Sequence, residues 1–435
     1  MRKFINYLIY LFVFLLPWQT RFIFERGILN GEEWEYGTKG VYGTEVLLGL
    51  ILVLSIVYFL TCPKSKVQSR SQRVKSLSAL GVFIIAFGLN CLVAIDGGIA
   101  FYRLGILVSV VAFGFVVVVM RPEFVRVAWA VVYASIIQGS LAINQFITNS
   151  VVGNKWLGMS SQDPSILGVP AVEVNGERIL RAFGSFPHPN ILAGFLIVSL
   201  FLIIYLYTRN KKMQKMISLV FVINFMALLT TLSRGAIVAF VVGLVVMAFF
   251  VGKDKIVSRA TTKFAIIAVF ILVLFTVSFP GLMVTRSMST NEIEVKSNEQ
   301  RMSQYSEFAE IYKNNWVYGV GIGNYTLAKY ELNPNLHGGE YQPIHNTYLL
   351  IIAELGLMGV AIILLFVFYI LNELRNYKKW SHEKVVAFSI LVALMITGVF
   401  DHYAWDFWSG VVMLALVIVY GLRIGTDVRI ENKAK

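Results

Sequence analysis

Apolar runs of about 16 to 25 residues alternate along the chain with short polar segments, and this pattern predicts membrane-crossing α-helices. A helix needs about 20 apolar residues to cross the roughly 30 Å of hydrocarbon in a bilayer. We expect about twelve such helices, near residues 4–18, 41–60, 77–95, 101–120, 125–147, 187–207, 216–232, 235–251, 264–283, 345–371, 385–400 and 407–423. The predicted fold is an all-α integral membrane protein with a single polytopic domain over residues 1–435.

One long polar stretch, from about residue 297 to 354, interrupts the apolar pattern. Within it, residues 300–315 carry apolar side chains at spacings of three and four, which predicts an amphipathic helix. The glycines between residues 319 and 323 predict a tight turn, because no alternation of strands and helices surrounds them. His345 stands where the next apolar run begins. We therefore expect a long, partly helical external loop over 284–344 that bears part of the active site.

Composition and charge add a topology to this picture. The chain is 57% hydrophobic and only 14% charged, and its net charge is +13. If the N-terminus is cytoplasmic, the predicted cytoplasmic segments hold 25 of the 38 Lys and Arg residues but only 6 of the 25 acidic residues. Such a bias is the normal signal of orientation in a membrane protein. It predicts cytoplasmic N- and C-termini and contacts with anionic lipid, and it gives no support to nucleic-acid binding.

Arg234 lies in the sequence Thr-Leu-Ser-Arg-Gly between two apolar runs, with almost no loop to hold it. An arginine in such a position is costly to place in a membrane, and it usually faces a bundle interior or a cavity. The alternative is that Arg234 extends to the lipid headgroups at a tight turn. The functional interpretation is an anion-binding residue at the external rim.

Arg301 and His345 are the other two candidates for chemistry. Arg301 on the external helix is either solvated or a second anion ligand, and two guanidiniums beside one site suit a diphosphate because each binds phosphate oxygens through two N–H groups. His345 is either a helix cap or a general base, since its imidazole titrates near neutral pH. Glu354 falls on the opposite helix face from His345, so a direct pair is not expected and a packing role is favoured.

Three further external residues are candidates for substrate contacts. Arg181 precedes the sixth predicted span and is a third external cation, either solvated or functional. Asp401 and His402 lie between the last two spans, where they have a structural role or contact the acceptor. No set of Cys, His and carboxylate residues has the spacing of metal ligands, so neither a metal nor another cofactor is predicted.

Taken in order, these motifs resemble those of the O-antigen ligase and O-antigen polymerase superfamily of bacterial membrane glycosyltransferases. The resemblance rests on the Arg-x-x-Gly and Pro-Asn pairs at 181–190, Ser-Arg-Gly at 233–235, Arg301 on a loop helix, the Gly-x-Gly-x-Gly run, and His-Asn-x-Tyr-Leu from His345, which leads to Glu-Leu-Gly at 354–356. It covers about residues 181–360 by motif. The motifs are shared by ligases and polymerases, so they do not separate the two.

The resemblance implies a glycosyltransferase with an all-helical fold of the C type. Such enzymes move a glycan from undecaprenyl diphosphate to an acceptor hydroxyl, such as one on the lipid A core, at the external face of the bacterial plasma membrane, without a metal. By motif match, Arg234 and Arg301 would hold the diphosphate and His345 would assist the acceptor, which makes these three the expected catalytic residues. Asn346 and Tyr348, within the same motif, are expected to bind substrate.

Several alternatives remain at this point. A polymerase would use another lipid-linked repeat unit as its acceptor, and a ligase acting on protein is a third member of the same class. A transporter or lipid flippase is the alternative from a different class. It predicts ionisable residues near the middle of the bilayer, whereas the notable ones here gather at one rim.

Overall fold

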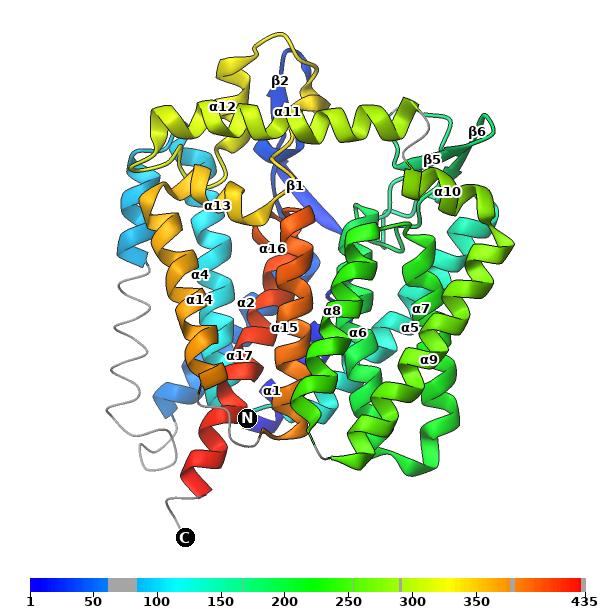
Figure 1. The fold of residues 1–435 in the computed structure, drawn as a ribbon. Helices are drawn as coiled ribbons and strands as arrows, with labels where there is room; N and C mark the ends of the chain where they lie inside the picture. The colour runs from blue at the N-terminus through cyan, green and yellow to red at the C-terminus, as the bar shows by residue number, and fades with distance from the viewer. Residues whose placement is uncertain (62–83, 167, 253, 289–291, 376–379, 432–435) are drawn as a thin grey trace.

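The computed structural model describes residues 1–61, 84–166, 168–252, 254–288, 292–375 and 380–431. These residues form a bundle of long helices that run side by side, with α11 lying across one end (Figure 1). The helices are α1 (Arg2–Leu15), α2 (Gly43–Thr61), α4 (Gly97–Met120), α5 (Phe124–Thr148), α6 (Pro189–Arg209), α7 (Gln214–Thr230), α8 (Arg234–Val251), α9 (Lys255–Ser278), α10 (Pro280–Met288), α11 (Glu292–Asn315), α12 (Tyr325–Leu332), α13 (Thr347–Leu355), α14 (Leu357–Arg375), α15 (His382–Phe400), α16 (Tyr403–Asp406) and α17 (Trp408–Glu431).

Eight of the described helices are long and apolar enough to cross a membrane. They are α2, α4, α5, α6, α7 with its preceding turn η3 (Lys211–Met213), α8, α9 and α15. Two shorter apolar segments, Leu357–Phe368 in α14 and Trp408–Gly421 in α17, accompany them. The prediction of an all-α polytopic membrane protein is confirmed. In the predicted span 77–95, residues 77–83 lie outside the described residues, and residues 84–92 are helical.

Two of the predicted spans are broken in the structure. The segment 345–371 is interrupted at Gly356, whose φ of 58° ends α13 before α14 begins. A Cβ atom at Gly356 would lie 2.5 Å from the carbonyl oxygen of Val317, so the close approach of this loop requires glycine. The segment 264–283 is likewise interrupted, because α9 ends at Ser278 and Pro280 begins α10.

Three small hairpins cover the end of the bundle that α11 crosses, and the apolar pattern did not predict them. They pair β1 (Arg21–Glu25) with β4 (Lys39–Tyr42), β2 (Ile28–Leu29) with β3 (Glu32–Glu33), and β5 (Ala171–Val174) with β6 (Glu177–Leu180). The last two turn at Asn30-Gly31 and Asn175-Gly176, where all four residues have positive φ. Asn-Gly is the usual signal for a two-residue hairpin turn, so the sequence did contain this information.

The long polar stretch is mostly helical. It forms most of α11, all of α12, the short turn η4 (Gly338–Glu340) and most of α13, while α10 precedes it in the chain. The predicted helix over 300–315 is present, but it starts eight residues earlier, at Glu292. Figure 1 shows α11 extending from above α12 and α13 to the β5–β6 hairpin, so this helix bridges two sides of the bundle.

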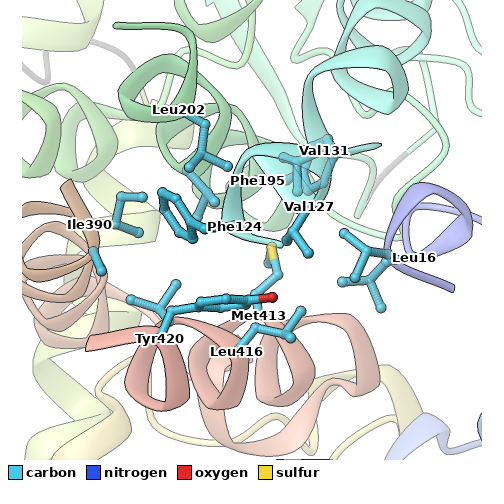
Figure 2. A pocket seen from close by; sticks show the side chains of 14 residues that line it. Leu16, Phe124, Val127, Val131, Phe195, Leu202, Ile390, Met413, Leu416 and Tyr420 are labelled. Atoms are coloured by element: carbon cyan, nitrogen blue, oxygen red, sulfur yellow. The ribbon is translucent and has the colours of Figure 1, made fainter. Parts of the chain in front are cut away.

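The core of the bundle surrounds α6, which is buried along most of its length. Its neighbours α5, α7 and α15 pack along it. A small pocket of about 40 Å³ lies in this core, and Figure 2 shows its lining. The lining side chains shown there include Phe124, Phe195, Leu202, Met413 and Tyr420, and none of the residues around the pocket carries a charge.

Candidate active site

A polar cavity of about 840 Å³ lies at the end of the bundle crossed by α11. Five segments line it, within residues 19–42, 155–170, 183–191, 338–345 and 401–407. Its wall includes His188, His345 and His402, together with the carboxylate of Asp401. A cavity of this size with convergent titratable groups has the properties of a substrate site.

His345 is held in place by α13 on one side and α11 on the other. Asn346 is the N-cap of α13, and its side-chain oxygen accepts hydrogen bonds from the backbone N–H groups of Tyr348 (3.0 Å) and Leu349 (3.1 Å). This cap fixes the chain direction one residue after His345. The ring of His345 contacts Gln304 of α11, with 3.1 Å between Nδ1 and the Oε1 atom.

His402 lies beside His345 and has a carboxylate partner. The two ring centroids are 5.2 Å apart and the rings meet edge to face. The Nδ1 atom of His402 is 2.7 Å from the Oδ2 atom of Asp406, four residues later. Burial by itself would lower the pKa of His402, but Asp406 and Asp401 outweigh it and raise that pKa to about 8. His402 is therefore positively charged at neutral pH.

His345 and His188 have the opposite protonation state. Burial is the main cause that lowers the pKa of His345 to about 3, and the neighbouring His402 adds to it. Burial also lowers the pKa of His188 to about 4. The Nδ1 atom of His188 accepts a hydrogen bond from the N–H of Asn190 at the start of α6, which requires a lone pair on that nitrogen. Both rings are neutral at pH 7, and a neutral imidazole is the form that accepts a proton.

Asp401 connects the histidines to the arginine Arg181. Burial would raise the pKa of its carboxyl group, but the nearby histidines, His402 first, and a hydrogen bond from Asn190 hold that pKa below its usual value. Asn190 in turn accepts a hydrogen bond from the Nη2 atom of Arg181 at 2.6 Å. The ionised Asp401 thus lies at one end of a chain of polar contacts that leads away from the histidines.

Three guanidinium groups meet around the turn between α7 and α8. The Nε atom of Arg181 donates to the carbonyl of Thr231 (2.9 Å), and the Nη2 atom of Arg286 donates to that of Leu232 (2.6 Å). Arg234 is the first residue of α8, and its Nη1 atom donates to the carbonyl of Arg286 (2.6 Å). We call Arg181, Arg234 and Arg286 the arginine cluster. Leu232 has a φ of 51°, a conformation costing about 1 kcal/mol or more, which is typical of functional sites.

Arg301 approaches the histidines from α11. It lowers the pKa of both His345 and His188 through its positive charge, although burial is the larger cause in each. Arg301 precedes Gln304 by three residues, so the two side chains share one face of α11. The positive charge predicted for this loop helix therefore lies close enough to His345 and His188 to lower their pKa values.

The glycine run that follows α11 fixes the position of α13. Gly319, Gly321 and Gly323 all have positive φ, as the predicted tight turn requires. The N–H groups of Val320 and Gly321 donate to the carbonyls of Ala353 and Glu354, each at 3.0 Å. A Cβ atom at Gly319 would lie 2.2 Å from the Glu354 carbonyl oxygen, so only glycine allows this contact.

Glu354 has the packing role expected of it. Its Oε2 atom accepts a hydrogen bond of 2.7 Å from the indole Nε1 of Trp405 in α16. This contact ties α13 to the short helix that follows His402. It supports the positions of the histidines without contributing to the cavity lining.

The predicted site residues thus differ in how they relate to the cavity. His345, Asp401 and His402 line the cavity. Arg301 lowers the pKa of His345 in the cavity wall through its positive charge. Arg181 donates a hydrogen bond to Asn190, which in turn donates one to Asp401. Arg234 belongs to the arginine cluster and does not line the cavity.

Asn346 and Tyr348, the remaining predicted substrate-binding residues, make contacts within the protein. The side chain of Asn346 caps α13, and the Tyr348 hydroxyl donates to the carbonyl of Met395 at 2.8 Å. Neither lines the cavity. These contacts position α13, and a role of the two residues in substrate binding stays a prediction.

The sequence analysis gave no role to Gln304, Asn190 or Arg286. Gln304 and Arg286 are ordinary polar residues on loop helices, and nothing in their local sequence distinguishes them. The four-residue spacing of His402 and Asp406 is a signal that could have predicted their contact. Within the described residues, no group of three or more His, Cys, Asp and Glu side chains is arranged to hold a metal ion.

Comparison with known proteins connects this site to a family. Residues 219–364 match the family model described as O-antigen ligase. This segment contains Arg234, Arg301, Gln304 and His345. The match therefore covers the α7–α8 turn, α11 and α13.

Three proteins of Rickettsia species are also similar, and their names include the words polysaccharide ligase. The chain is 26% identical to the protein of Rickettsia felis over 122 residues, 25% to that of Rickettsia typhi over 119, and 28% to that of Rickettsia prowazekii over 119. Each alignment covers 26% of this chain and 29% of the relative, so it spans less than a third of the relative's length. The chain is therefore similar to O-antigen ligases over residues 219–364, and it shares a shorter similarity with these named polysaccharide ligases.

Proposed function

We propose that this protein is a membrane glycosyltransferase of the ligase type, which transfers a glycan from undecaprenyl diphosphate to a hydroxyl group of an acceptor such as the lipid A core. Its family supports a role in polysaccharide processing. The observation that carries the finer proposal is the position of Asp401. It lines the cavity with His345 and His402, accepts a hydrogen bond from the His402 backbone N–H, and is joined through Asn190 to Arg181 of the arginine cluster.

The arginine cluster and Arg301 are proposed to bind the diphosphate of the donor. When the acceptor oxygen attacks the anomeric carbon, the bond from that carbon to the phosphate oxygen breaks and negative charge grows on the diphosphate. Guanidinium groups stay charged at any physiological pH and bind phosphate oxygens through paired N–H donors. They stabilise the leaving group by fixed positive charge, a role that elsewhere belongs to a metal ion, so the proposed reaction needs no divalent cation.

His345 is proposed to remove the proton from the acceptor hydroxyl. Its neutral ring lines the cavity, and taking up the proton leaves the new glycosidic oxygen without charge. His402, charged at neutral pH, lies beside this ring, so the proton on His345 is lost readily after the transfer. Asp401 is proposed to orient the acceptor through its hydrogen-bonding oxygens.

We propose that the site faces outward from the bacterial plasma membrane, with both termini in the cytoplasm. The excess of Lys and Arg in the predicted cytoplasmic segments supports this orientation. The beginning of α1 and the end of α17 lie at the end of the bundle opposite α11 (Figure 1), which agrees with termini on one side and the cavity on the other.

A polymerase is the alternative within the same family, with a second lipid-linked repeat unit as the acceptor. The cavity wall and the arginine cluster suit either acceptor, because both present a sugar hydroxyl. A ligase and a polymerase are therefore distinguished by the acceptor that the protein uses, and the test includes both acceptors.

The test is glycan transfer by the purified full-length protein in lipid nanodiscs. The donor is a glycan on undecaprenyl diphosphate, and the acceptors are a lipid A core or a second molecule of donor. We expect a glycosylated lipid A core, with the rate unchanged by a chelator and lowered about 1,000-fold by His345→Ala. The matched control is His337→Ala, an exposed histidine at the N-cap of η4, which should keep the full rate. Lengthening of the donor alone would favour the polymerase, and a fully active His345→Ala variant would refute the role of His345.

A further inference from the structure

Gln304 is a buried polar side chain of α11 that faces His345. It is 7% exposed, although α11 is a polar helix lying over the end of the bundle. Its Oε1 atom is 3.1 Å from the backbone nitrogen of His345 and 3.1 Å from the Nδ1 atom of the same residue. A single amide oxygen therefore contacts both the backbone and the ring of one histidine.

The contact with the backbone determines which end of the amide faces His345. A backbone N–H group is only a donor, so the atom that meets it must be an acceptor. The amide of glutamine has one acceptor, its oxygen, and one donor, its NH₂ group. The oxygen of Gln304 must therefore point to His345, and the opposite orientation would bring two donors together.

This orientation in turn determines the tautomer of the histidine ring. The Oε1 atom of Gln304 accepts hydrogen bonds and cannot donate one, so the Nδ1 atom of His345 has to carry the hydrogen. In the neutral ring, the lone pair then lies on Nε2, the nitrogen on the far side from Gln304. This is the tautomer that a general base needs if the substrate approaches from the cavity.

We propose that Gln304 is a positioning residue that holds His345 in the Nδ1–H tautomer, with its Nε2 lone pair directed to the acceptor. This inference rests on the proposed function of His345 as a base. Arg301 lies three residues before Gln304 on α11, so one helix would both contribute charge to the donor site and orient the base.

The charges around His345 explain why an amide suits this role. The ring is faced by His402 and Asp401 from the α15–α16 junction, by Arg301 from α11 and by His188 from the start of α6. A carboxylate in place of the Gln304 amide would add a negative charge beside Nδ1 and favour the imidazolium. The neutral amide fixes the tautomer while leaving the ring unprotonated.

Two substitutions separate orientation from packing. Gln304→Met keeps the length of the side chain but removes the acceptor, and we expect transfer to fall roughly 100-fold, less than the ~10⁴-fold loss seen when a carboxylate orienter is lost. Gln304→Glu keeps the acceptor and adds charge. Because the base must be neutral to act, a raised pKa of His345 moves the acid limb of the pH–rate profile to higher pH, with the rate recovering above it. Gln300 is an exposed glutamine on the same helix, so Gln300→Met is the matched control. It should change neither the transfer rate nor the position of the acid limb.

The tautomer itself is measured by ¹⁵N NMR of the histidine-labelled wild-type protein, with the His345 signals identified by their loss in His345→Ala. We expect the shifts of a protonated Nδ1 and an unprotonated Nε2. A wild-type rate in Gln304→Met, an unshifted profile in Gln304→Glu, or the Nε2–H tautomer would each overturn the inference. A fully active His345→Ala variant would instead refute the proposed function, so the two failures are distinguishable.

Discussion

The polar cavity and the apolar pocket are two hollows of opposite chemistry that share the same helix. Ile191, in the first turn of α6, lines the cavity, and Phe195, one turn later, lines the pocket shown in Figure 2. The cavity is about 840 Å³ and has a charged and titratable wall, whereas the pocket is about 40 Å³ and has an uncharged one. The environment of α6 therefore changes from polar to apolar within about 6 Å along its axis.

This difference is what we expect of an enzyme whose chemistry lies at one end of the bundle. A transport path would place ionisable groups near the middle of the bundle, where the apolar pocket lies. The side chains that line that pocket are apolar apart from the hydroxyl of Tyr420. We therefore expect substitutions at the polar cavity to change the rate of glycan transfer and substitutions at the apolar pocket to change stability.

The largest effect is expected from removing a guanidinium. Arg301→Ala removes a positive charge beside the histidines, and we expect the rate of glycan transfer to fall about 1,000-fold because the departing diphosphate loses a fixed cation. The measurement is transfer by purified protein at saturating donor. Arg126→Ala, at an exposed ion pair with Glu123 at the other end of the bundle, should leave the rate unchanged. Equal rates for the two variants would remove Arg301 from the site.

A smaller effect is expected from Asp406→Asn, which removes the carboxylate that raises the pKa of His402. In the wild type, the folded-state pKa of about 8 lies above the usual 6.5. Charging of His402 thus adds about 2 kcal/mol of stability below pH 6.5, and this is lost as the pH rises through 8. Asp406→Asn should lower that pKa and flatten the pH dependence of stability between pH 6.5 and 8.

The measurement for Asp406→Asn is the thermal midpoint of the solubilised protein across this pH range, together with the transfer rate. If charged His402 assists the reaction, the alkaline limb of the pH–rate profile moves to lower pH. A stability curve identical to that of the wild type would contradict the assigned His402–Asp406 contact.

The smallest effect on the reaction is expected at the apolar pocket. Phe195→Ala enlarges a hollow in a packed core, which should reduce the free energy of unfolding by about 3 kcal/mol while leaving the transfer rate per folded molecule near that of the wild type. Thermal unfolding and activity of the same preparation check both parts. Phe249→Ala, on the exposed face of α8, is the control for stability. Loss of activity without loss of stability would show that the two hollows are coupled.

The sequence by itself determined the class of fold and predicted an approximate place for the chemistry. Apolar length identifies membrane-crossing helices because each must satisfy its own backbone in lipid, and this signal is local. The family motifs identified Arg234, Arg301 and His345, and the start of an apolar run located His345 at the end of a helix. The Asn-Gly turns at residues 30–31 and 175–176 were equally local signals, although the apolar pattern did not include them.

Only the tertiary structure decided which groups meet. Asn190 contacts Asp401 across 211 residues of sequence, Gln304 contacts His345 across 41, and Arg234 contacts Arg286 across 52. Periodicity shows which face of a segment is apolar, but it carries no information on which distant segment packs against that face. The protonation states of the histidines follow from these contacts, because burial and neighbouring charges exist only after the helices pack.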